Sequence, residues 1–121
     1  MIVFRRVINP REVQLTVHAD LNEGSVAEFR SALYAELDQP ATRILLDLSR
    51  VRSVNSAALG AILLVQKRAR ENGKVVVIAK CSNELRSTLL AIRLDRILEI
   101  IGEEPPTFSS EKDRPSQSVQ S

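Results

Sequence analysis

Residues 44–60 read ILLDLSRVRSVNSAALG and join a short apolar segment to a longer one. Ile44 to Leu48 form an apolar run with the length of a buried strand. A short polar stretch follows. Ser56 then opens an apolar segment that continues to Asn72-Gly73, a pair typical of a helix end. The sequence therefore predicts a central strand, a loop and a helix whose first half is apolar all round and buried.

Three further segments have the patterns of strands. Val75 to Ala79 is apolar and β-branched, as in a second buried strand. Val13 to Val17 alternates between apolar and polar residues, which indicates a half-buried strand. Ile2 to Arg6 is a short apolar strand, and the turn residues Asn9-Pro10-Arg11 predict that it forms a hairpin with the alternating one.

Two more helices complete the pattern. Val26, Phe29, Leu33 and Leu37 recur at helical spacing, and Asn22 or Ser25 can cap that helix. A third helix is expected over residues 83–92, with Ser82 or Asn83 as its cap, and a last short strand over residues 97–101. The expected order is strand, strand, helix, strand, helix, strand, helix, strand.

This order predicts a single α/β domain with a mixed sheet flanked by helices. The initial hairpin is antiparallel, whereas strand–helix–strand crossovers imply parallel, right-handed pairing. The domain covers residues 1–101. Residues 102–121 are polar and rich in Pro and Ser, so we expect a flexible tail there.

Composition limits the classes of function. The 121 residues carry a net charge of +2 with interspersed signs, so no basic stripe predicts direct binding of nucleic acid. Cys81 is the one cysteine, which fits a reducing, cytoplasmic setting, and neither a signal peptide nor membrane insertion is expected. No catalytic pair, phosphate-binding glycine loop or metal-ligand spacing occurs, so we expect no enzyme, cofactor or metal.

Ser56 is the residue whose chemistry is open to two interpretations. It stands where the N-cap of the apolar helix is expected, so its hydroxyl can simply accept a bond from a first-turn N–H. Alternatively, it is a phosphorylation site. A helix N-terminus tolerates phosphate, and the added charge would repel a partner built for a neutral hydroxyl.

The stretch Ile44 to Gly60 resembles the signature of STAS domains, and residues 79–82 and 89–98 resemble later blocks of the same family in the right order. The resemblance covers residues 1–101 and implies that fold. In bacterial anti-sigma-factor antagonists of this family, the segment reads Asp-Ser-Ser/Thr-Gly-Leu-Gly. The first serine is phosphorylated by an anti-sigma factor with serine kinase activity, and phosphorylation releases the complex.

In this chain the acid corresponds to Asn55 and the phosphorylated serine to Ser56, while Ala57 and Ala58 replace the next two residues. The resemblance thus implies a non-enzymatic anti-sigma-factor antagonist with Ser56 as its switch. The expected partner-binding residues are Asp20, Asn22, Ser53, Asn55, Ser56, Ala57, Leu59 and Gly60. For Asp20 and Asn22, a turn and cap is the alternative to a partner contact.

Two other functions remain open. The uncharged Asn55 favours a STAS adaptor subunit without a phosphate cycle, in a signalling scaffold or a lipid-transport ATPase complex. A small enzyme or nucleotide binder ranks last because no catalytic pair is visible.

Overall fold

The computed structural model describes residues 1–101, so the predicted flexible tail lies outside the described residues. Within that range the chain forms five strands, three α-helices and one 3₁₀-helix. The strands are β1 (Val3–Asn9), β2 (Glu12–Val17), β3 (Arg43–Leu48), β4 (Val75–Cys81) and β5 (Glu99–Ile100). The helices are α1 (Val26–Glu36), α2 (Ser56–Glu71), α3 (Asn83–Ala91) and the 3₁₀-helix η1 (Leu94–Arg96).

The sheet has the predicted mixed topology. Its strand order is β1-β2-β3-β4-β5, in which β1 pairs with β2 antiparallel and the remaining neighbours pair parallel. The expected α/β class and element order are confirmed. The last strand is shorter than predicted because Ile97 and Leu98 form a turn that closes on η1, where both N–H groups donate to the Leu94 carbonyl, and Leu94 and Leu98 are buried in the core.

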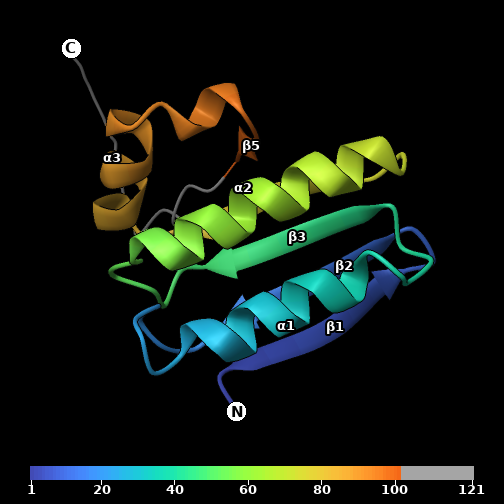
Figure 1. The fold of residues 1–121 in the computed structure, drawn as a ribbon, viewed down its shortest axis with the longest axis horizontal. Helices are drawn as coiled ribbons and strands as arrows, with labels where there is room; N and C mark the ends of the chain where they lie inside the picture. The colour runs from blue at the N-terminus through green and yellow to red at the C-terminus, as the bar shows by residue number, and fades with distance from the viewer. Residues whose placement is uncertain (102–121) are drawn as a thin grey trace, which may run out of the picture.

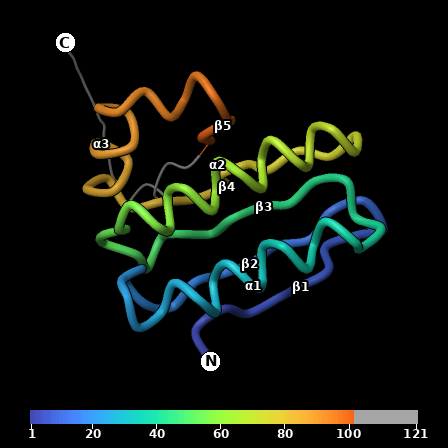
Figure 2. The backbone as a smooth tube through the Cα atoms, viewed as in Figure 1, coloured from blue at the N-terminus to red at the C-terminus, as the bar shows by residue number. Residues whose placement is uncertain are grey.

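Helices α1 and α2 lie side by side over one face of the sheet (Figure 1). The backbone tube shows β4 running behind α2, and α3 lying beside the first turns of α2 (Figure 2). The alternation predicted for β2 is confirmed, since Val13, Leu15 and Val17 are buried while the residues between them are half-buried. The fully buried core is aliphatic apart from Phe29 and Cys81.

The prediction that the first half of α2 is buried all round is wrong. Ala58 and Ile62 are fully buried, but Ala57 and Gly60 are exposed and Leu64 keeps 38% of its surface. The reason is geometric: α2 packs against the sheet and against α1, so one of its sides faces outward. An apolar strip therefore remains accessible near the start of α2.

Lys74 links the turn before β4 to the end of α1 and the segment that follows it. Its ammonium donates to the backbone carbonyls of Gln39 and of Ala41 (3.0 Å), and lies 3.4 Å from that of Glu36. Helix α1 has no basic residue in its own last turn, so this cation supplies the charge that the helix C-terminus favours. The contact fixes the end of the molecule opposite to the loops described next.

Candidate functional site

Because β2, β3 and β4 are parallel, the connections that follow them meet at one edge of the sheet. The loop after β2 and the loop after β3 are joined by backbone bonds. Leu21 N–H donates to the Ser53 carbonyl (3.0 Å), and Asn55 N–H donates to the Leu21 carbonyl (2.8 Å). These bonds form a short parallel bridge between Leu21 and Val54. The two loops are thus one continuous surface.

Asp20 strengthens this junction through its carboxylate. Oδ1 accepts from the backbone N–H of Arg52 (2.7 Å) and Ser53 (3.4 Å), and Oδ2 lies 3.2 Å from the Arg52 guanidinium. The hydrogen bond from Arg52 N–H, aided by Ser53 N–H and the guanidinium, holds the pKa of the Asp20 carboxyl below its usual value. Asp20 therefore holds the loop after β3 in place, a role that neither sequence interpretation included.

Asn55 is the N-cap of α2, which corrects the placement of Ser56 at that position. The Asn55 backbone is extended, and its Oδ1 accepts from Ala58 N–H (2.8 Å). Asparagine caps as well as serine does, and a residue one position earlier is the better placed of the two here. Ser56 is the first helical residue instead.

The Ser56 side chain is exposed and makes no hydrogen bond within residues 1–101. Among those residues, no acceptor binds the backbone N–H groups of Ser56 and Ala57, and no acidic residue lies in the first turn of α2. The Ser56 hydroxyl therefore lies at the positive end of α2, and the first turn of that helix carries no carboxylate. The arrangement can accept a phosphate without a local clash of charge.

The other predicted site residues fall into two groups. Exposed to solvent are Asn22, Ser53, Ala57 and Gly60; half-buried are Asp20, Asn55 and Leu59. All eight lie on the joined loops or the first turns of α2, so the fold brings the predicted set together.

Ser25 occupies the N-cap position of α1, as one of the two predicted alternatives, but without a side-chain capping bond. Neither Asn22 nor Ser25 caps the helix through its side chain. Asn22 Oδ1 accepts from Gly24 N–H (2.9 Å), and the Ser25 hydroxyl donates to the Asp20 carbonyl (2.7 Å). These bonds instead shape the loop itself, because they close it on the segment that carries Asp20.

Two serines beyond the predicted set support the loop after β3. The Ser82 hydroxyl caps α3 by accepting from Leu85 N–H (3.2 Å), as predicted, and contacts the Val51 carbonyl at 3.3 Å. Ser49 donates its hydroxyl to the largely buried Asp47 (2.7 Å). Val51 itself is fully buried, so it anchors the loop in the core. The Ser82 contact has no local sequence signal, because it joins residues 31 positions apart.

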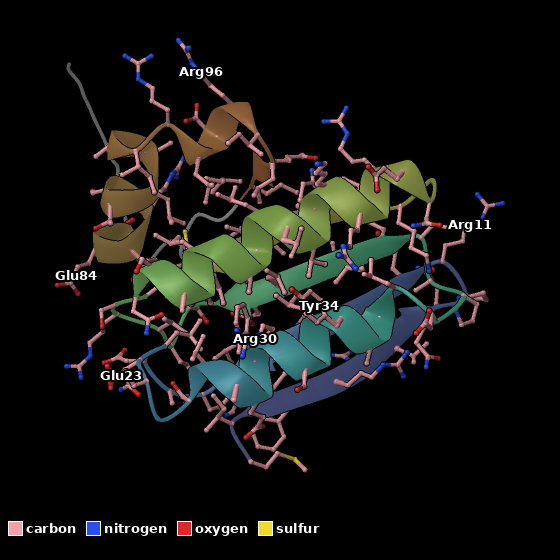
Figure 3. The ribbon with its side chains drawn as sticks, in the orientation of Figure 1. Arg11, Glu23, Arg30, Tyr34, Glu84 and Arg96 are labelled. Carbon is pink, nitrogen blue, oxygen red and sulfur yellow. The ribbon has the colours of Figure 1, made fainter. Side chains whose placement is uncertain are left out.

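Acidic side chains border this edge of the molecule. Glu23, on the loop after β2, and Glu84, in the first turn of α3, lie at the same end, whereas Arg30 and Tyr34 extend from α1 toward α2 (Figure 3). Residues 1–101 contain no grouping of His, Cys, Asp or Glu suited to a metal ion. Among the helices of that range, none has the length and apolar character to span a bilayer.

The structure is that of a small α/β domain in which a short loop joins the central strand β3 to the N-terminus of α2. The family model described as "Mlab, STAS domain" matches residues 4–101, and the chain belongs to the STAS domain family. The suspected resemblance is thereby confirmed.

Solved structures agree with this assignment. The putative anti-sigma-factor antagonist TM1081 of Thermotoga maritima is 25% identical with a TM-score of 0.73, over 81% of this chain and 84% of the other. The unphosphorylated form of the anti-sigma-factor antagonist SpoIIAA shares the fold at 13% identity and a TM-score of 0.68, over 81% and 86%. The phosphorylated form of Bacillus SpoIIAA aligns at 14% identity and 0.64, over 81% and 89%.

Proposed function

We propose that this chain is an anti-sigma-factor antagonist that binds an anti-sigma factor with serine kinase activity and is released when Ser56 is phosphorylated. The observation that carries the proposal is the free, exposed hydroxyl of Ser56 at the start of α2. Because Asn55 caps the helix, the hydroxyl is available to a kinase without loss of a structural bond. In this function the chain is a cytoplasmic binding module that needs no cofactor.

The proposed docking surface consists of the joined loops and the outward side of α2. It contains Asp20, Asn22, Ser53, Asn55, Ser56, Ala57, Leu59 and Gly60. Small side chains along the first two turns let a partner approach the helix backbone closely. Exposed Leu64, one turn beyond Gly60, offers an apolar contact at the far end of the same strip.

Phosphorylation would act mainly on the interface. A phosphate adds about two negative charges at pH 7 to this surface, and the unpaired amides of Ser56 and Ala57 can accept it. The carboxylate of Asp20 is already paired with Arg52, so it adds little repulsion. The domain should therefore keep its fold while a partner that fits the neutral hydroxyl is repelled.

The test combines phosphorylation with binding. The chain is incubated with ATP and the anti-sigma kinase encoded nearest to its own gene, and phosphate is mapped by mass spectrometry. We expect phosphate on Ser56 in the wild type and in Ser53→Ala, the matched control in the same loop, but none in Ser56→Ala. Phosphate on Ser53, or no phosphate at all, contradicts the switch.

Binding of the same kinase is then measured by calorimetry. We expect Ser56→Ala to bind like the wild type and Ser56→Asp to bind at least about tenfold more weakly, with an unchanged circular dichroism spectrum. If neither the wild type nor Ser56→Ala binds the anti-sigma factor, the antagonist function itself is wrong.

A second function is favoured by one observation. Asn55 caps α2 as an aspartate would but carries no charge beside Ser56, which suits a STAS adaptor subunit without a phosphate cycle. Such a subunit would belong to a signalling scaffold or a lipid-transport ATPase complex. Co-purification with an ATPase, unaffected by Ser56→Asp, would select this function over the first.

A further inference from the structure

A hollow of about 550 Å³ lies between the end of α1 and the second half of α2. Two leucines give it an apolar centre: Leu37 is half-buried, and Leu64 keeps 38% of its surface exposed. The rim of the hollow is polar and consists of Asp38, Lys67, Arg68, Glu71 and Asn72. An apolar centre inside a polar rim is the arrangement found in protein interfaces.

The charges on this rim are not neutralised by the domain itself. None of Asp38, Lys67, Arg68 and Glu71 takes part in an ion pair within residues 1–101. Lys67 and Glu71 have the four-residue spacing that allows such a pair on a helix, yet they do not form one. The rim therefore offers charges of both signs to the side chains of a protein partner.

The hollow is continuous with the proposed docking surface. Ser56, Gly60 and Leu64 are four residues apart, so they follow one another along the same face of α2. No atom of another described element lies within 4 Å of the point where a Cβ on Gly60 would stand. The face is thus open from Ser56 to Leu64, a distance of about 12 Å at a rise of about 1.5 Å per residue.

We propose that this hollow is a second contact point for the anti-sigma factor, which places an apolar side chain there whether or not Ser56 is phosphorylated. The inference rests on the proposed function, because it assigns the hollow to the same partner. A standard interface covers about 800 Å² of each protein, which is wide enough for one partner to reach both Ser56 and Leu64.

Two separate contact points change what phosphorylation does to the complex. Substitutions more than about 7–10 Å apart that share no contact act additively on the free energy, so their effects on Kd multiply. Ser56 and Leu64 meet that condition. Phosphorylation therefore weakens the complex without removing the contact in the hollow, and the remaining affinity of the phosphorylated chain depends on Leu64.

The first test measures binding of the anti-sigma kinase to the full chain by calorimetry. Leu90 is the matched control for Leu64, because it is a helical leucine on α3 with 41% of its surface exposed. We expect Leu64→Glu to weaken binding at least about tenfold and Leu90→Glu to bind like the wild type, both with native circular dichroism spectra. Leu64→Met, which keeps an apolar side chain of similar volume, should bind within about twofold of the wild type.

Leu64→Ala reports the same loss should Leu64→Glu fail to fold. A Leu64 variant that binds the kinase as Leu90→Glu does overturns the second contact point and leaves the antagonist function intact. If the wild type itself does not bind the kinase, the proposed function fails and the inference fails with it. A Leu64→Glu effect on self-association in sedimentation equilibrium, with kinase binding unchanged, would assign the hollow to a second copy and overturn the proposal.

The second test asks whether the contact persists in the phosphorylated state. The double variant with Ser56→Asp and Leu64→Glu should weaken binding by the product of the two single fold-changes. A double variant that binds no more weakly than Ser56→Asp alone would show that the partner leaves the hollow when position 56 is charged, which refutes a contact independent of phosphorylation.

Discussion

Replacement of Asn55 by alanine tests the assignment of the cap on which the availability of Ser56 depends. Asn55 Oδ1 accepts from Ala58 N–H at 2.8 Å, whereas the Ser56 hydroxyl has no partner among the described residues. Loss of an N-cap side chain costs about 1 kcal/mol, within a range of about 0.5–2 kcal/mol. Asn55→Ala should therefore lower the free energy of unfolding by about 1 kcal/mol, and Ser56→Ala should change it by less than about 0.5 kcal/mol.

Asn55→Asp should behave differently from Asn55→Ala. Aspartate caps equally well, and its negative charge interacts favourably with the positive end of α2. We expect the aspartate variant to match the wild type or to exceed its stability by about 0.3–1 kcal/mol. Under the proposed function, the same variant supplies the acid that the family resemblance implies at position 55, and it should increase phosphorylation of Ser56 if a carboxylate helps to position the hydroxyl.

Urea denaturation followed by circular dichroism measures these differences. In thermal unfolding of a domain of this size, a difference of about 1 kcal/mol in the free energy of unfolding corresponds to roughly 4–8 °C in the melting temperature. Asn83→Ala is a suitable control, because Asn83 is an exposed first-turn residue of α3 whose cap is the preceding Ser82. If Ser56→Ala destabilises the protein by as much as Asn55→Ala does, the Ser56 hydroxyl is engaged in capping and the reasoning is refuted.

Three other substitutions have clear expected outcomes. The backbone N–H groups of Val3 and Ile2 lower the pKa of the Glu28 carboxyl. The carboxylate therefore stabilises the fold above its unfolded pKa, and this stabilisation is lost as the pH falls through the folded pKa. In urea titrations, Glu28→Gln should be less stable than the wild type at pH 7, and the difference should shrink below about pH 4.5. Gln66 is buried and accepts from Val76 N–H at 2.8 Å; Gln66→Met should cost about 1–3 kcal/mol by urea denaturation, and a cost near zero would mean that water replaces the amide. Arg93 has a left-handed backbone (φ 63°) after α3; Arg93→Gly should raise the melting temperature by a few degrees, and a decrease would show that the arginine side chain outweighs the backbone strain.

Much of the fold could be predicted because the decisive patterns are local. The alternation in β2 and the apolar runs of β3 and β4 specify strands, and the order of helices between them specifies parallel pairing. The outward strip of α2 was not predictable from composition alone. Ala57, Gly60 and Leu64 are as apolar as their buried neighbours, and only the packing of the helix on one side decides which of them face solvent.

The candidate site was located from the sequence, but its internal contacts were not. Asn55 and Ser56 are both good N-cap residues. Which of the two caps α2 depends on backbone geometry, which the sequence pattern does not specify. The bond from Arg52 N–H to Asp20 spans 32 positions, and neither residue type signals the other. Long-range contacts of this kind arise because the sheet places the two loops side by side, which a reading along the chain cannot supply.

For the proposed complex with an anti-sigma factor, the bridge between Leu21 and Val54 affects the kinetics of binding. Two loops that are already bonded to each other lose little conformational entropy when a partner arrives, so the complex can form without a slow rearrangement. Substitutions on this surface should then alter mainly the dissociation rate. Loss of the bridge, in contrast, would slow association, because the two loops would have to become ordered while the partner binds.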